Sequence, residues 1–168
     1  MPNRALITCG LLVATLSTYA SQPALNGQLL CTVVGITDGD TIKALCAGNE
    51  QMKVRLAEID APEKAQPFGT RAKQSLSDMC FGKQARITTQ GRDRYGRTIG
   101  RIYCFSPGVK METDASAEQV RRGMAWVYDS YVTDSSLYQL QDEARGDGRG
   151  LWADSAPTPP WEWRKARR

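Results

Sequence analysis

Five short segments of β-branched, aromatic or alternating apolar residues constrain the fold more than any other feature of this chain. They are residues 30–37, 41–47, 51–59, 85–89 and 99–105. In the third segment Met52, Val54 and Leu56 alternate with polar residues, which is the period of a half-buried strand. The Asp38-Gly39 pair between the first two segments predicts a hairpin turn. The sequence therefore predicts five strands, the first two joined as a hairpin.

Helical spacing follows the third and fifth strands. Apolar residues recur every three or four positions in residues 68–79, 117–125 and 137–144. Asp134 or Ser135 would cap the third helix. Five strands and three helices indicate an α+β protein, for which a closed OB-like barrel is one arrangement and other α+β folds remain open.

The chain begins with the pattern of a secretory signal peptide, predicted over residues 1–20. Arg4 supplies a positive charge, residues 5–16 are apolar, and Thr18-Tyr19-Ala20 offers a cleavage site. A lipoprotein site at Cys9 is a weaker alternative, because Thr8 is a poor match there. The rest divides into a short lead (21–28), one domain (29–153) and a Pro-rich basic tail (154–168). From the signal peptide we expect a periplasmic or secreted protein with no membrane association after signal cleavage.

The tail carries several basic residues, and we expect it to be solvated. The overall charge is mildly basic, with 22 Lys and Arg against 18 Asp and Glu. A surplus this small does not by itself indicate a nucleic-acid partner. The arginines between residues 92 and 101, which alternate with Asp93 and Tyr95, are more typical of phosphate contact.

Four cysteines remain after the predicted signal peptide, an even number that suits disulfide bonds in an exported protein. Four cysteines allow three connectivities. If Asp38-Gly39 forms a two-residue turn, cross-strand partners have numbers that sum to 77, as Cys31 and Cys46 do. We predict the pair Cys31–Cys46, which leaves Cys80–Cys104, although a one-residue slip of register would separate the first pair.

Chemistry-bearing residues gather in three segments, 38–41 (DGDT), 55–63 (RLAEIDAPE) and 93–97 (DRYGR). Carboxylate oxygens suit a hard cation such as Ca²⁺, and paired arginines suit the charge that builds on a phosphoryl group. The chain has no histidine. The usual general base and the commonest zinc ligand are therefore absent. Carboxylates, arginines and a metal would have to carry out any hydrolysis.

In this order and spacing, the three segments resemble the staphylococcal nuclease (thermonuclease) family, and the likeness runs from about Leu29 to Trp152. The resemblance implies a five-stranded OB barrel with three helices. It also implies Ca²⁺ coordination by Asp40, Asp60 and the backbone carbonyl of Ala61. Many members of the family have Thr at this last position, but a backbone carbonyl does not depend on the side chain. Asp38 is expected only to stabilise its turn.

The same resemblance makes Arg55 and Arg97 catalytic, and we expect both side chains to be exposed. A guanidinium stays protonated and presents a fork of donors that matches two phosphodiester oxygens. Glu63 is assigned as general base or water-positioning group, with the choice left open. Four further residues could bind the terminal phosphate of a nucleotide or stack on a base, namely Arg94, Tyr95, Tyr128 and Tyr131. Tyrosine in the segment 126–128 could equally be part of the core.

These residues are compatible with two functions. The first is an exported, Ca²⁺-dependent endonuclease that hydrolyses DNA and RNA by attack of a metal-bound water, leaves 3′-phosphate ends and acts as a monomer. The second is a catalytically silent OB-type module that binds nucleic acid. A silent relative would be expected to have lost part of the carboxylate and arginine set. The complete set favours the enzyme.

Overall fold

The computed structural model describes residues 27–106, 108 and 111–167. The predicted signal peptide and most of the predicted lead lie outside these residues. Within the part of the chain that the structure describes, no helix is both long and apolar enough to cross a bilayer.

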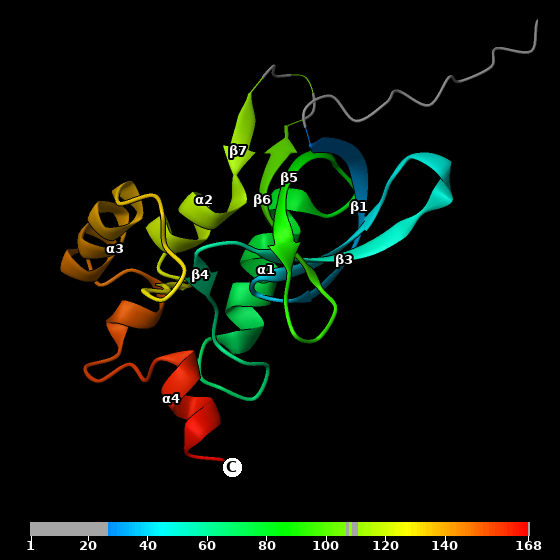
Figure 1. The fold of residues 1–168 in the computed structure, drawn as a ribbon. Helices are drawn as coiled ribbons and strands as arrows, with labels where there is room; N and C mark the ends of the chain where they lie inside the picture. The colour runs from blue at the N-terminus through cyan, green and yellow to red at the C-terminus, as the bar shows by residue number, and fades with distance from the viewer. Residues whose placement is uncertain (1–26, 107, 109–110, 168) are drawn as a thin grey trace, which may run out of the picture.

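Five strands form a closed barrel, as predicted (Figure 1). The strands are β1 (Gln28–Asp38), β2 (Thr41–Leu45), β3 (Gln51–Leu56), β5 (Gln84–Arg92) and β6 (Thr98–Phe105). Successive neighbours pair antiparallel in the order β3-β2-β1-β5-β6. A parallel pairing of β3 with β6 then closes the barrel. Closure joins the two strands that would otherwise be open edges, and the OB-like α+β fold is confirmed.

The β1–β2 hairpin differs from the prediction at its tip and agrees with it at its base. Asp38 pairs with Thr41, so the turn residues are Gly39 and Asp40 rather than Asp38 and Gly39. Two irregularities in β1 then each shift the register by one residue. Further from the turn the partner numbers sum to 77, as predicted, and Cys31 is bonded to Cys46 across the hairpin.

The predicted strand 51–59 is split in two, so its prediction as one continuous strand was wrong. Strand β3 ends at Leu56, and a separate short strand, β4 (Ile59–Asp60), pairs with β8 (Trp126–Val127). Glu58 causes the break, because its φ of 69° is incompatible with a strand. The split directs Asp60 away from the barrel sheet and into a two-stranded ribbon.

Three helices lie where the sequence predicted them, α1 (Gly69–Cys80), α2 (Ala115–Arg121) and α3 (Ser136–Gly146). Helix α1 buries its apolar stripe against the barrel, and Cys80 at its end is bonded to Cys104 of β6. Both predicted disulfides are therefore present. Helix α2 is capped by β7 (Glu112–Asp114), whose last carboxylate accepts the Ser116 and Ala117 N–H groups. Two 3₁₀ turns, η1 (Ala47–Asn49) and η2 (Gly150–Ala153), follow β2 and α3 respectively.

The core lies between the barrel and helices α1 to α3. Its largest side chains, each less than 2 % exposed, include Ile42, Leu56, Ile87 and Ile102 from the strands and Leu76 from α1. Because apolar side chains from all five barrel strands meet here, Val33 of β1 among them, the barrel holds the ends of β1, β3 and β6 in fixed relative positions. The candidate site lies at those ends.

The C-terminal tail is not a solvated segment, and this expectation was wrong. Residues 160–165 form a fourth helix, α4 (Pro160–Lys165), which begins with proline at its first position. Trp161 stacks on Tyr128 with ring centroids 5.5 Å apart and planes inclined by 18°, and it also meets the edge of Trp126. In Figure 1 this helix, in red, lies beside the loop that leads from β4 to α1. The tail therefore packs against the domain.

Candidate active site

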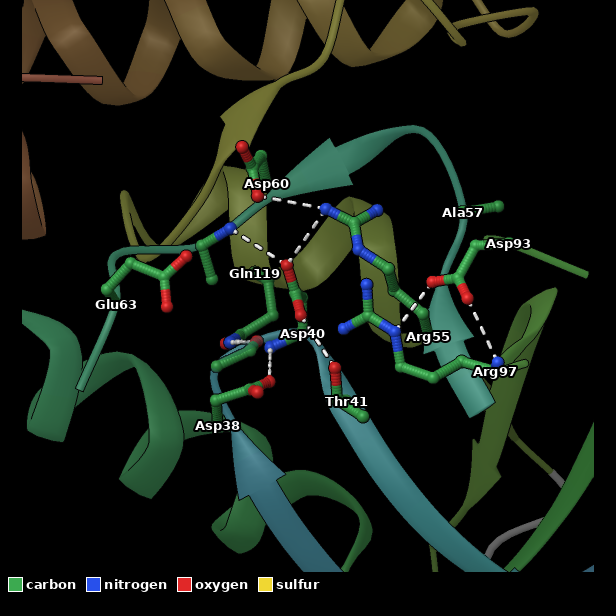
Figure 2. Close-up of polar contacts among 12 residues, drawn as sticks. Asp38, Asp40, Thr41, Arg55, Ala57, Asp60, Glu63, Asp93, Arg97 and Gln119 are labelled. Carbon is green, nitrogen blue, oxygen red and sulfur yellow. Dashed lines mark hydrogen bonds and ion pairs between the residues drawn. The ribbon is translucent and has the colours of Figure 1, made fainter. Parts of the chain in front are cut away.

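The turn between β1 and β2 fixes Asp40 at the mouth of the barrel. Asp38 Oδ1 accepts the Asp40 N–H at 3.2 Å, so Asp38 stabilises the turn as expected. Asp40 Oδ1 accepts the Thr41 hydroxyl at 2.8 Å, and Asp40 Oδ2 accepts the Ala61 N–H at 3.1 Å. These bonds, drawn in Figure 2, hold the Asp40 carboxylate in one orientation and tie it to the second motif.

Gly39 lets this turn approach helix α1. A Cβ at Gly39 would lie 2.6 Å from the Ala72 Cβ and 2.8 Å from the Ala61 Cβ. Beneath the turn, the buried Gln119 side chain donates to the Gly39 carbonyl at 2.7 Å and to the Ala72 carbonyl at 3.0 Å. Helices α1 and α2 thus both support the turn that carries Asp40.

Asp60 and Asp40 converge on one guanidinium group. Arg55 Nη2 lies 2.9 Å from Asp60 Oδ1 and 3.3 Å from Asp40 Oδ2. The side chain of Arg55 is only 14 % exposed, so the expectation that it would be exposed was wrong. It lies inward because the two carboxylates need a counter-charge once the barrel has removed them from water. Figure 2 shows the three side chains meeting between β3 and β4.

Burial makes the carboxylates of Asp60 and Asp38 costly to ionise. Desolvation raises the pKa of Asp60 above its ordinary value, with the nearby Asp40 charge adding to the rise while bonds from arginine oppose it. Desolvation, followed by the same Asp40 charge, raises the pKa of Asp38 to about 7. A cation that binds among such buried acidic residues stabilises their ionised forms.

Arg97 and Glu63 flank this centre. Arg97 Nε donates to Asp93 Oδ2 at 2.6 Å within the turn before β6, and its side chain is 24 % exposed rather than fully exposed. Figure 2 shows it running from that turn toward Arg55. Glu63 lies on the opposite side, just after Pro62, and its side chain is 42 % exposed.

Every residue predicted for catalysis, metal binding or substrate contact lines one open cleft with a volume of about 990 Å³. Tyr95 and Tyr131 are exposed there, and Tyr95 lies under the guanidinium groups of Arg94 and Arg97. Tyr128 is half-buried between Tyr131 and the tail tryptophan. The structure therefore gathers the predicted set, and the role of each residue stays a prediction.

One residue of this cleft, Arg164 of helix α4, was not predicted from the sequence. Its guanidinium binds both Asp60 and Glu63. Asp60 and Arg164 are 104 positions apart. No local pattern relates them, although a basic residue among tryptophans after Pro159-Pro160 was a signal for a docked segment rather than a solvated one.

The carboxylate oxygens of Asp40 and Asp60 are suitable ligands for a hard cation. Asp40 Oδ2 and Asp60 Oδ1 approach the same arginine nitrogen, so both can reach one positive charge. Both belong to carboxylates, the ligands that Ca²⁺ prefers. Among the described residues no group of three or more His, Cys, Asp or Glu side chains is arranged to hold a metal. A cation bound to these two carboxylates would need further oxygens from the backbone, water or substrate.

An OB barrel with a mouth of carboxylates and arginines defines a class of protein suited to binding and hydrolysing phosphodiesters. The model of the staphylococcal nuclease homologue family matches residues 53–154. An uncharacterized endonuclease of Haemophilus influenzae is 41% identical over 163 residues, which are 97% of this chain and 86% of the Haemophilus protein. A micrococcal nuclease of Shigella flexneri is 44% identical over 139 residues, which are 80% of this chain and 79% of the Shigella protein. A probable staphylococcal-like nuclease of rice is 39% identical over 119 residues, which are 71% of this chain and 34% of the rice protein.

The chain belongs to the staphylococcal nuclease family. It is a phosphodiester-hydrolysing enzyme, and its substrates are nucleic acids.

Proposed function

We propose that the protein is a Ca²⁺-dependent endonuclease that cleaves both DNA and RNA and leaves 3′-phosphate ends. The observation that carries this proposal is the convergence of Asp40 and Asp60 on one cationic position, with two arginines and a glutamate around the same cleft. A bound Ca²⁺ would supply positive charge beside the scissile phosphate and increase the acidity of a water molecule there.

Arg55 and Arg97 bind the phosphodiester. Each offers a planar fork of donors, and these donors interact more strongly as negative charge accumulates on the phosphate oxygens. Asp93 orients Arg97, and the two acidic residues orient Arg55. Because these partners fix both guanidinium groups before substrate arrives, little reorganisation is needed during the reaction.

Glu63 accepts a proton from the attacking water or positions that water. It is placed for this role at the edge of the cleft, on the other side of the carboxylates from Arg97 (Figure 2). Tyr95, Tyr128 and Tyr131 offer aromatic surfaces in the same cleft, on which bases could stack without sequence preference. Such contacts suit an enzyme that acts on both DNA and RNA.

The protein is proposed to act outside the cytoplasm, as a monomer in the periplasm or medium. Two disulfide bonds support an oxidising compartment. The alternative, a silent OB-type binding module, is less well supported, because the side chains needed for hydrolysis are all present and lie around one cleft.

Cleavage assays test the proposal directly. The mature protein should cut plasmid DNA and RNA with Ca²⁺, and excess chelator should stop both reactions. Arg97→Ala should lower turnover by about 10²-fold or more, whereas Arg121→Ala, a matched change on the exposed face of α2, should not. Mass spectrometry of a cleaved oligonucleotide identifies the phosphorylated end. Full cleavage in chelator, or 5′-phosphate products, would refute the corresponding part of the proposal.

A further inference from the structure

Arg164 occupies Asp60, one of the two carboxylates that the proposed cation needs. Its Nη2 lies 2.7 Å from Asp60 Oδ2, and its Nη1 lies 3.2 Å from Asp60 Oδ1 and 2.7 Å from Glu63 Oε1. With Arg55 also on Asp60 Oδ1, both oxygens of Asp60 have an arginine partner. The helix that carries Arg164 lies beyond residues 53–154, the part matched by the family model.

Helix α4 is held in place by contacts that do not involve Arg164. Gln66 donates to the Thr158 carbonyl at 2.6 Å, and Pro160 is buried at the start of the helix. Trp161 is stacked on Tyr128. The Arg164 side chain itself is 38 % exposed. The backbone is thus anchored next to the site, while the guanidinium borders open cleft and has room to change partner.

A guanidinium and a divalent cation compete for Asp60, because two positive charges held close to one carboxylate repel each other. Charge-assisted bonds from arginine to a buried carboxylate are among the stronger polar interactions in proteins, and Asp60 is only 1 % exposed. A cation that binds Asp60 therefore repels the Arg164 guanidinium and favours its displacement. The displaced guanidinium needs another anion, and the phosphate groups of a substrate in the same cleft are such partners.

We propose that Arg164 is an internal counter-cation that competes with the metal at Asp60, so that metal and phosphodiester bind cooperatively. Without substrate, Arg164 lowers the affinity for Ca²⁺. With substrate, Arg164 moves from the carboxylates to the phosphate, and the metal takes its place. This proposal rests on the proposed function, because it requires Asp60 to be a metal ligand. It makes Arg164 a residue that sets cation affinity in this enzyme.

The cooperativity is a coupling free energy between two ligands and is measured by calorimetry. Ca²⁺ is titrated into the protein alone and into the protein saturated with a short phosphorothioate-linked oligothymidylate. In the wild type the oligonucleotide should tighten Ca²⁺ binding. In Arg164→Gln, Ca²⁺ binding to the protein alone should tighten by at least about fivefold. The ratio of the Ca²⁺ affinities with and without the oligonucleotide should fall by a similar factor.

Lys165→Gln is the matched control, because it removes the same charge from the next residue of α4, whose side chain is exposed. It should behave as the wild type. Thermal unfolding and Trp fluorescence report whether α4 remains docked in each variant. Arg164→Lys provides a second test, since an ammonium group cannot hold both oxygens of Asp60 as a fork and should also tighten Ca²⁺ binding to the protein alone.

The outcomes separate the two proposals. If Asp60→Asn abolishes Ca²⁺ binding while both Arg164 variants bind Ca²⁺ as the wild type does, with unchanged coupling, Arg164 is only an anchor for the tail and the inference is wrong. If Asp60→Asn binds Ca²⁺ normally, the proposed metal site is wrong and the inference fails with it. Tighter binding in the Arg164 variants but not in Lys165→Gln supports the competition.

Discussion

Arg55 Nη2 lies 2.9 Å from Asp60 Oδ1, and the two side chains are only 14 % and 2 % exposed. This ion pair links the barrel strand β3 to the short strand β4, and it is shared with Asp40. Because both acidic residues are largely desolvated, the arginine is a structural partner as well as the proposed phosphate ligand.

Replacing Arg55 by Ala should therefore have two effects. Cleavage should fall by about 10²–10³-fold, and the free energy of unfolding should fall by about 3 kcal/mol, because Asp40 loses its arginine partner and Asp60 loses one of its two. Arg55→Lys should recover part of the stability but little of the cleavage, because an ammonium group lacks the bidentate fork. Urea unfolding and single-turnover kinetics measure the two effects separately. An Ala variant as stable as the wild type would show that Arg164 alone can neutralise the site.

Gly39→Ala should disturb the turn that carries Asp40. The new Cβ would lie 2.6 Å from the Ala72 Cβ, a distance at which something must move. We expect a loss of about 1–3 kcal/mol in the free energy of unfolding and slower cleavage. Gly146→Ala is the control, because no atom lies within 4 Å of the added Cβ, and it should be neutral or slightly stabilising. Equal stabilities for the two variants would refute the close approach of the turn to α1.

Reduction of the disulfides should destabilise the fold without removing the chemistry. The bonds Cys31–Cys46 and Cys80–Cys104 join residues 15 and 24 positions apart. Each restricts the unfolded chain and should contribute about 2–4 kcal/mol. No cysteine in the described part of the chain lines the cleft. The reduced protein should therefore unfold at lower urea concentration but still cleave DNA at temperatures where it remains folded, and mass spectrometry reports the thiol state.

Asp134 should make stability depend on pH in the acidic range. Bonds from Ser136, followed by the bond from Arg101, lower the pKa of Asp134 from its ordinary 3.8 to about 2. The stabilisation is present above about pH 4, where the unfolded chain is also ionised, and it is lost as the pH falls from about 4 to 2. Because Asp134 is partly exposed, we expect only about 1 kcal/mol from this group.

Unfolding of the wild type and Asp134→Asn at several pH values measures this dependence. The variant should be less stable than the wild type at pH 7, and the difference should shrink toward pH 2. Asp147→Asn is a suitable control, since Asp147 is an exposed carboxylate that pairs with Arg149 away from this network. A difference that is constant from pH 7 to pH 2 would contradict the lowered pKa.

Local patterns of residues were enough to predict the five barrel strands, apart from the break in the third, together with the three main helices and the disulfide partners. The periodicity of neighbouring residues reports which face of an element is buried, and it needs no knowledge of the rest of the fold. The hairpin is instructive, because the cysteine pairing was right although the turn was displaced by a residue. The two register shifts in β1 restored the predicted pairing. The three motifs, through the family resemblance that rests on them, also identified most of the charged residues that the barrel gathers into one cleft.

How those residues meet depends on contacts that form only when the chain has folded. Glu58 breaks the third strand because distant groups, among them the Thr133 and Asp134 N–H groups, bind its carboxylate. Arg55 lies inward because closing the barrel places two carboxylates beside it. Arg164 reaches Asp60 across 104 positions of sequence through the packing of α4. Contacts between remote segments depend on the shape of the whole fold, and no local pattern of residues encodes that shape.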